Sequence, residues 1–397
     1  MIGPEWSGPE RDRPSAGGGG PRRIAVVTGT RAEFGLLVPI MRAIEARDDL
    51  ELLVIAAGAH LVQPALTFKE VKRHFAVADS IPMQTAGRVG RWHDVESLGK
   101  GIARFGRSFD RLAPDIVLVL GDRIEAFAAA SAASIGGLPV AHVHGGDLAE
   151  GVADEAMRHA ITKLAHIHLP ATEASAARIQ RMGEDPSRVT VVGSPAIDGL
   201  ADIEPMTDDA AHELGDPQAV LLMHPVGRPD EVEEAAASAA LEALNDVRAL
   251  VLMPNLDPGR RGIVRAIEQA GASENMTTRD HLPRPVFVSL LKRLSEKGGV
   301  LVGNSSAALI EAGALRVPAV TIGTRQTDRE RGTNVVDAAG ETAELIRIAL
   351  DRARQLDPAA ITHPFGAGQA GPKSAELLAS INLAERSLLR KRWHQGD

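Results

Sequence analysis

The sequence predicts an α/β protein built from two doubly wound, Rossmann-like domains that face a central cleft. Short, almost wholly apolar segments alternate with segments whose apolar residues recur at helical spacing, and this pattern is typical of a parallel sheet covered on both faces. The alternation begins near Arg23, is interrupted by the acidic, turn-rich stretch 200–217, and then starts again. A length of 397 residues is enough for two or three domains, each with its own core.

In the first half, each buried apolar run is followed by a glycine-containing turn and then by a helix. The predicted strands lie at 24–30, 50–58, 115–122, 138–146, 167–172 and 188–195. The predicted helices lie at 35–46, 124–134 and 154–166. The second half repeats the scheme, with strands at 218–226, 248–255, 298–305 and 318–324 and helices at 231–247, 262–270, 286–295 and 307–314.

The same pattern suggests how the chain is divided. Residues 1–22 are rich in Gly, Pro and charge without an apolar core, so we expect a disordered tail that is not a signal peptide. We expect an N-terminal Rossmann-like domain over 23–200, with carboxylates that are candidates for catalysis, and a C-terminal Rossmann-like domain over 201–372, with a turn that suits a phosphate. A helix within 373–397 is expected to pack back on the N-terminal domain.

Composition excludes several classes of protein. The net charge of −8 argues against a nucleic-acid binder, although a local basic cluster can still hold a phosphate. The absence of cysteine excludes disulfides, thiolate catalysis and cysteine-ligated zinc. No apolar run reaches the roughly 20 residues that cross a bilayer, so no membrane partner is expected and the expected location is the cytoplasm.

Polar residues that directly follow predicted strands are the first candidates for a site, because ligands of open α/β sheets bind at the carboxyl ends of the strands. These residues are Arg31, Asp122, His144, His224, Asn255, Ser306 and Arg325. Each also has an ordinary structural interpretation. Arg31 can pair with Glu33, Asp122 can cap the next helix, and His224 can be a core histidine.

The segment from Gly298 to Gln326 combines a strand, the turn 304–306 and a predicted helix that contains Glu311. The N–H groups at such a helix start suit a phosphate, and Glu311 could accept hydrogen bonds from a sugar. Otherwise Ser306 is a plain N-cap and Glu311 a solvated helix residue. Arginines at 325, 329 and 331 follow, and a cluster of them beside the turn would neutralise a diphosphate.

The stretch 142–163 is the densest group of titratable residues. His142 and His144 share a face if both lie on a strand, which leaves a metal site as an alternative, although no set of carboxylates completes one. Asp154 and Arg158 lie four residues apart at the start of the next helix, a spacing that also occurs as ordinary helix support. With Asp122 and His144 nearby, this group would suit the removal and return of a proton.

Taken together, these motifs resemble the UDP-N-acetylglucosamine 2-epimerases, specifically the hydrolysing branch of sialic-acid-type sugar synthesis. The resemblance covers about residues 23–383. It rests on the ordered motifs GTRAEFG, GDRIEA, HVHGGDLAEGVADEAMRHAITKLAHIH, VVGSPAID, MHPV, PNLDPG, LPRPVFVSLLK, GNSSAALIEA and GTRQ. It implies the GT-B fold, with the active site between the domains.

The resemblance also implies a reaction. The proton at C2 of the sugar is removed while UDP leaves C1, water then adds to the resulting glycal, and UDP and free N-acetylmannosamine are released. It assigns acid/base roles to Asp122 and Asp154, a catalytic role to His224, nucleotide binding to Ser306 and Glu311, and phosphate binding to Arg31. We add His144 as catalytic and the neighbouring polar residues as binding residues: Arg158, Asn255, Ser305 and Arg325.

The sequence departs from the family's pattern at three positions. His144 stands where many members have Glu, and this favours hydrolysis over simple epimerisation. Asp328 precedes Arg329 where members often show Gly-Arg, and Leu36 stands where some relatives have lysine. A modified amino sugar is therefore an open alternative for the substrate.

The resemblance implies a homodimer and a UDP-sugar as the partner molecule, with no cofactor and no metal, because protein cations can bind the diphosphate. Two other functions stay open at this point. One is a GT-B glycosyltransferase that needs an acceptor, and the other is a nucleotide-sugar binder without catalysis.

Overall fold

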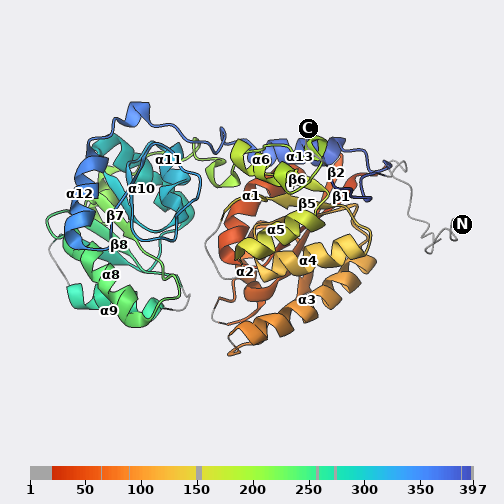
Figure 1. The fold of residues 1–397 in the computed structure, drawn as a ribbon, viewed down its shortest axis with the longest axis horizontal. Coiled ribbons are helices and arrows are strands. Elements are labelled where there is room, and N and C mark those ends of the chain that lie inside the picture. The colour runs from red at the N-terminus through yellow and green to blue at the C-terminus, as the bar shows by residue number, and fades with distance from the viewer. Residues whose placement is uncertain are drawn as a thin grey trace, which may run out of the picture.

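The computed structural model describes residues 20–394 except 64, 89, 149–153, 256–258, 272–274 and 386, and it leaves the side chains of Ala32 and Asp154 undescribed. The expected N-terminal tail therefore lies almost wholly outside the described residues. The described chain forms two α/β lobes that lie side by side, each around its own parallel sheet (Figure 1).

The N-terminal sheet has the strand order β3-β2-β1-β4-β5-β6, and every strand pairs in parallel. Its strands are β1 (Arg22–Thr28), β2 (Leu50–Ala57), β3 (Val77–Ile81), β4 (Ile116–Leu120), β5 (Val140–Val143) and β6 (Ile167–Leu169). The helices between them are α1 (Arg31–Glu45), α2 (Phe68–His74), α3 (Arg91–Leu112), α4 (Ile124–Ile135), α5 (Asp154–Leu164) and α6 (Glu173–Arg181).

The C-terminal sheet has the order β12-β11-β10-β7-β8-β9, again wholly parallel. Its strands are β7 (Ala219–Leu222), β8 (Ala249–Leu252), β9 (Met276–Arg279), β10 (Val300–Gly303), β11 (Ala319–Thr321) and β12 (Val335–Asp337). The helices are α7 (Asp208–His212), α8 (Asp230–Ala243), α9 (Arg260–Ala270), α10 (Arg284–Lys297), α11 (Glu311–Ala314), α12 (Ala343–Arg354) and α13 (Ala370–Ser380).

Both sheets therefore share one winding scheme. In each, the first strand of the domain lies beside the fourth, so the chain reverses its direction of winding between β1 and β4 and again between β7 and β10. The carboxyl edge at such a switch point is open, because the following connections run to opposite faces of the sheet. The two-domain α/β architecture predicted from the sequence is confirmed.

Each sheet has apolar side chains packed on both of its faces. In the N-terminal domain, α1 and α13 cover one face and α3, α4 and α5 the other. In the C-terminal domain, α8, α9 and α12 cover one face and α10 the other. Leu36 on α1 is partly buried and packs against apolar clusters of both lobes. The Leu36 side chain therefore contributes to the apolar packing between the two lobes.

The chain crosses between the lobes twice, and the two crossings are bonded to each other. The Ser194 N–H donates to the carbonyl of Phe365 (2.9 Å). The Asp198 carboxylate accepts from the N–H groups of Ala370 (3.0 Å) and Gly371 (2.7 Å) at the start of α13. Helix α13 then packs on α1 of the N-terminal lobe, as Figure 1 shows. The lobes are thus linked by two segments that are hydrogen-bonded to each other.

Two segments differ from the sequence prediction. Residues 188–195 do not form a strand. They run beside β6, where Thr190 and Val192 donate to His168 (2.9 Å) and Pro170 (3.1 Å), but only a single bridge forms. Pro170 has no N–H to continue the ladder.

The predicted helix 307–314 is also wrong. A 3₁₀ turn (η4, Ser306–Ala308) is followed by the four-residue α11. The reason is that the Asn334 side chain donates to the carbonyl of Ala308 (2.9 Å), which a continuous helix would use itself.

Several strands and helices of the structure were not predicted from the sequence: β3, α2, α3, α6, β9, β12 and α12. The strands among them are partly exposed and polar, so they lack the continuous apolar run that marks a central strand.

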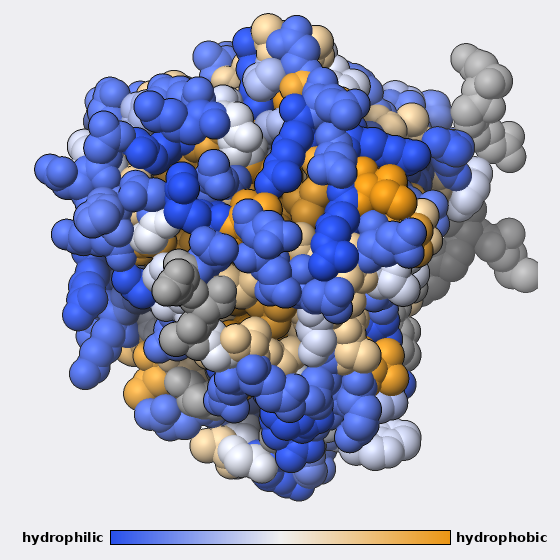
Figure 2. All heavy atoms as spheres, turned by 90° about the vertical axis from the view of Figure 1, so that its left-hand side faces the viewer, coloured by the Kyte–Doolittle hydropathy of each residue, from blue (hydrophilic) through white to orange (hydrophobic). Residues whose placement is uncertain are grey.

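Polar side chains cover most of the outer face of the C-terminal lobe, and apolar residues show only in gaps between them (Figure 2). Within the described part of the chain, none of the helices combines the length and apolar character that a membrane span needs.

Two glutamates are buried together at the carboxyl end of β1. Glu33 accepts from the Gly29 N–H, and Glu125 accepts from the Gln84 side chain (3.1 Å). The Oε2 atoms of both glutamates have no hydrogen-bond partner. Burial, together with the neighbouring charge of Glu125, raises the pKa of Glu33 to about 8. Glu33 is therefore a protonated, internal group at neutral pH.

This burial predicts a pH dependence of stability. Between the unfolded pKa of 4.5 and the folded pKa of about 8, the folded chain holds a proton that the unfolded chain has lost. The free energy of unfolding should therefore fall as pH rises through this window, by up to about 1.4 kcal/mol per pH unit. Glu33→Gln should remove this slope in urea unfolding between pH 5 and 8. Glu45→Gln, at the exposed end of the same helix, should keep it; equal slopes in both variants would contradict the assignment.

Candidate functional site

The carboxyl edge of the N-terminal sheet gathers a buried ion-pair cluster. Asp122 follows β4, and its Oδ2 pairs with the guanidinium of Arg158 on α5. The other arm of Arg158 donates to the carbonyl of His144 (2.9 Å) and lies 3.9 Å from Asp147. Arg158 is buried, so one cation holds two strand ends and two carboxylates together. Asp122 is not a helix cap, because the N-cap position of α4 is Arg123.

His144 occupies a fixed and unusual position. Its backbone has φ +58°, a left-handed conformation that a non-glycine residue rarely adopts. Its Nδ1 lies 2.7 Å from Asp147 Oδ2, and its Nε2 lies 3.1 Å from Ser194 Oγ. Because a carboxylate only accepts, the Nδ1 atom carries a proton.

This Ser–His–Asp arrangement resembles the triad of acyl-transfer enzymes, but it cannot work as one. Ser194 has no exposed surface, and its Oγ also accepts from the Ala196 N–H (3.3 Å). Burial alone would raise the pKa of Asp147, but the charge and hydrogen bond of His144, with Arg158 and Ser175, hold it well below its usual range. Asp147 and Ser194 therefore orient an imidazole beside an ionised carboxylate.

His142 does not join this group. It lies inside the sheet, where Nε2 donates to the carbonyl of Gly121 (2.8 Å), and burial lowers its pKa to about 3. It is a neutral core residue. Within the described ranges, no group of three or more His, Asp and Glu side chains is arranged to hold a metal ion.

The C-terminal lobe has its own cluster, centred on Asn304 after β10. The Asn304 side chain binds both the N–H and the carbonyl of His224 (2.7 Å each) across the switch point. The Asn304 carbonyl accepts from Arg325 (2.9 Å) and Gln326 (2.8 Å). His224 Nδ1 accepts in turn from the Asn255 N–H (3.2 Å). Three of the predicted residues, His224, Asn255 and Arg325, thus meet at one edge.

The turn at 304–306 belongs to the same edge. Ser305, not Ser306, is the capping residue, because its Oγ accepts from the Ala307 N–H (3.4 Å). The turn leads into only three 3₁₀ residues, so the expected helix start at Ser306 is absent. Glu311 begins α11, and burial raises its pKa despite the opposing charges of Arg284 and His144.

Arg31 is the predicted residue that joins neither cluster. It is exposed, lies 3.5 Å from Glu70, and bonds His281 of the C-terminal lobe (3.0 Å). It does not pair with Glu33, which bonds Gly29 instead. Helix α5 begins at Asp154, but the side chain of this predicted acid lies outside the described atoms.

Arg329, predicted only as one of three arginines that would neutralise a diphosphate, lies between the two clusters. It is half-buried, and burial lowers its pKa, while the charges of Asp147, Arg158, Arg325 and Asp122 all act on it. Its Nη1 donates to the side chain of Gln326 (3.0 Å). A small pocket lies here between the lobes, lined by Asp147, Leu148, Arg178, Ile310, Arg329, Glu330 and Phe365.

Asp328, expected to disturb this loop, does not face the pocket. It is exposed and has φ +60°, so the chain reverses at this point and the next residue, Arg329, turns inward. Asp147 and Ser194 were not predicted as site residues, because only the fold brings them together with His144. Asp147 alone had a local signal, since it lies three residues after His144.

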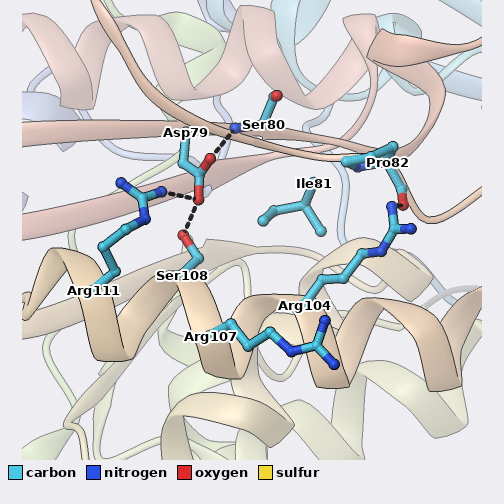
Figure 3. Close-up of a pocket in the computed structure, with 8 residues that line it drawn as sticks. All are labelled: Asp79, Ser80, Ile81, Pro82, Arg104, Arg107, Ser108 and Arg111. Carbon is cyan, nitrogen blue, oxygen red and sulfur yellow. Dashed lines mark hydrogen bonds and ion pairs between the residues drawn. The ribbon is translucent and has the colours of Figure 1, made fainter.

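A second hollow lies apart from this site. It is lined only by residues of β3, α3 and the turn after β3, and Figure 3 shows Asp79 between Arg111 and Ser108. Asp79 is 2.6 Å from Arg111 and accepts from Ser108 (2.5 Å). The Asp79 carboxylate thus already has an ion-pair partner and a hydrogen-bond donor from α3.

Sequence similarity to known proteins extends over most of the chain. The sequence model of the UDP-N-acetylglucosamine 2-epimerase family matches residues 42–379. The chain is 33% identical to a UDP-N,N'-diacetylbacillosamine 2-epimerase (hydrolyzing) of Legionella pneumophila, over 92% of this chain and 98% of the relative. It is 31% identical to a UDP-N-acetylglucosamine 2-epimerase of Neisseria meningitidis, over 92% and 96%.

Solved structures show the same fold at lower identity. The Neisseria meningitidis UDP-GlcNAc 2-epimerase bound to UDP-GlcNAc has a TM-score of 0.73 at 18% identity, covering 90% of this chain and all of that chain. The Staphylococcus aureus MnaA–UDP structure also has a TM-score of 0.73 at 18% identity, covering 90% and 96%. The two-lobe arrangement is thus that of known 2-epimerases, and the chain belongs to the UDP-N-acetylglucosamine 2-epimerase family.

Proposed function

We propose that this chain is a hydrolysing 2-epimerase of UDP-amino sugars, which releases UDP and a free 2-epimeric sugar. One observation carries the proposal. Asp122 and His144, held by Arg158, lie at one sheet edge, and Asp147 of this edge lines a pocket together with Arg329 of the facing lobe. A sugar nucleotide bound between these edges would meet acid/base groups on one side and cations on the other.

The proposed first step is an elimination. A base takes the proton at C2, the electron pair of that C–H bond forms the C1=C2 double bond, and the C1–O bond breaks as UDP leaves. Asp122 and Asp154 are the proposed acid/base groups, with His144 and His224 beside them. Since C2 beside an acetamido group is a weak carbon acid, departure of the diphosphate must be assisted.

The polar groups around Asn304 would supply that assistance. Arg325 is fixed on the Asn304 carbonyl, and Arg329 is half-buried in the same loop. Preorganised donors of this kind stabilise charge as it develops on a leaving group. Ser305, Ser306 and Glu311 are proposed to bind the nucleotide, with Asn255, Arg158 and Arg31 as further binding residues. In the second step water adds at C1 and a proton returns to C2 on the other face.

The relatives support the hydrolysing branch and leave two substrates to compare. The relatives from Legionella pneumophila and Campylobacter jejuni are both named as hydrolysing enzymes for diacetylbacillosamine nucleotides. The product is proposed to be an N-acetylmannosamine-type sugar for sialic-acid-type synthesis. The homodimer and the cytoplasmic location stay predictions, and light scattering after gel filtration tests the first.

Turnover in deuterium oxide tests the reaction itself. UDP-N-acetylglucosamine and UDP-N,N'-diacetylbacillosamine are supplied separately, without an acceptor, and products are followed by ³¹P and ¹H NMR. We expect UDP and a free sugar that carries deuterium at C2. A requirement for an acceptor would instead indicate a glycosyltransferase, and binding without turnover of either substrate a nucleotide-sugar binder.

Asp122→Asn separates catalysis from binding. The amide keeps the shape of the carboxylate but is a poor base, so turnover should fall by about 10²- to 10⁴-fold. The dissociation constant for UDP, measured by calorimetry, should change by less than about threefold. Full activity of this variant would overturn the site assignment.

Asp147→Asn tests the orientation of His144. The variant loses the charge that faces the imidazole and places an amide where a pure acceptor is needed, so turnover should fall about tenfold or more. The exposed Asp209→Asn on α7 is the matched control and should behave as wild type. Equal turnover in both variants would show that His144 needs no carboxylate partner.

A further inference from the structure

The loop Gly323–Gly332, here called the arginine loop, is firmly attached to the C-terminal lobe at its base. Arg325 and Gln326 donate to the Asn304 carbonyl (2.9 and 2.8 Å). Arg331 donates to the Gln326 carbonyl (2.5 Å) and pairs with Asp337 (2.6 Å). The base of the loop is therefore positioned by the sheet edge that also carries His224.

The far side of this loop reaches the other lobe. After the reversal at Asp328, the Glu330 Oε2 accepts from the hydroxyls of Thr172 and Ser175 (3.0 Å for Ser175). Thr172 is the N-cap of α6, and Ser175 lies in its first turn. The two hydroxyl hydrogen bonds and the positive end of the helix dipole both stabilise the negative charge of this carboxylate.

Ser175 also contacts the ion-pair cluster of the N-terminal lobe. Ser175 Oγ lies 2.7 Å from Asp147 Oδ1, while Asp147 Oδ2 bonds His144. A hydroxyl has one hydrogen, so Ser175 donates fully to either Glu330 or Asp147 at any moment. The contact between the lobes and the support of His144 therefore share a single donor.

The contact of Glu330 with α6 also positions the adjacent residue, Arg329. Thr172 and Ser175 are buried, and Glu330 and Arg329 are half-buried. With Glu330 bonded to α6, the neighbouring Arg329 lines the same pocket as Asp147 of the N-terminal lobe. The Glu330 contacts thus hold this part of the arginine loop against α6 of the N-terminal lobe.

We propose that Glu330 is an interdomain positioning residue, which keeps the lobes closed over the substrate by bonding Thr172 and Ser175. The proposal rests on the proposed function for its kinetic part only. A contact that stabilises the closed, binding-competent arrangement acts on apparent affinity, because the apparent dissociation constant rises as the competent fraction falls. Its loss should therefore raise KM far more than it lowers kcat.

The experiment compares the full-length wild type with Glu330→Ala and Glu330→Gln, and with Glu344→Ala as a control that removes an exposed glutamate of the same lobe. Hydrogen bonds to a charged group stabilise the arrangement that they join. Glu330→Ala should therefore raise KM, and the dissociation constant for UDP, by about ten- to a hundredfold. The change in kcat should stay within about threefold. Glu330→Gln keeps an acceptor oxygen and should lie between wild type and Glu330→Ala.

A double-mutant cycle identifies the partner. In the Ser175→Ala background, Glu330→Ala should raise KM by a factor several times smaller than it does in the wild-type background. Equal factors in both backgrounds would show that the two side chains do not act together. An unchanged KM in both Glu330 variants would overturn the proposal.

A measurement without substrate separates this proposal from the proposed function. Small-angle X-ray scattering of the free protein should give a larger radius of gyration for Glu330→Ala and Glu330→Gln than for wild type and Glu344→Ala. Identical scattering from all four proteins would refute the closed contact even in an active enzyme. If wild type turns over neither sugar nucleotide, the scattering difference and the UDP affinity still decide the role of Glu330.

Discussion

The cluster at the carboxyl edge of the N-terminal sheet depends on one buried cation, Arg158. Its guanidinium pairs with Asp122 and bonds the His144 carbonyl, so it joins the ends of β4 and β5 from α5. Two carboxylates this deeply placed would repel each other without a cation between them. Arginine suits the role because its planar, forked donors reach an acid and a carbonyl at once. Loss of this contact would release both catalytic candidates together.

The second constraint is that the site is divided between two bodies with the same winding. Each sheet presents one open switch point, and polar residues follow both flanking strands there. The tied crossings at Ser194–Phe365 and Asp198–Ala370 place these edges opposite each other. The arginine loop spans both edges: Arg325 bonds Asn304 on one lobe, and Glu330 bonds Thr172 and Ser175 on the other.

Much of this could be predicted from the sequence, for identifiable reasons. Asp122, His144 and His224 directly follow apolar runs that indicate buried strands, so the position of each one at the carboxyl edge of its own sheet follows from topology. Arg329 could be predicted only as one of three arginines near the 304–306 turn, because the sequence does not show that the left-handed turn at Asp328 directs this one inward. The helix expected after Ser306 failed for a similar reason, since Asn334, far along the chain, takes its carbonyl.

The central claim is that both edges act on one bound sugar nucleotide, and a crystal structure of Asp122→Asn with UDP-N-acetylglucosamine tests it most directly. The account predicts intact substrate between the lobes, with the diphosphate within hydrogen-bond distance, about 3.2 Å or less, of Arg325 or Arg329. It also predicts that C2 of the sugar faces position 122 and His144. A nucleotide held by one lobe alone, or a sugar whose C2 faces away from the Arg158 cluster, would contradict it.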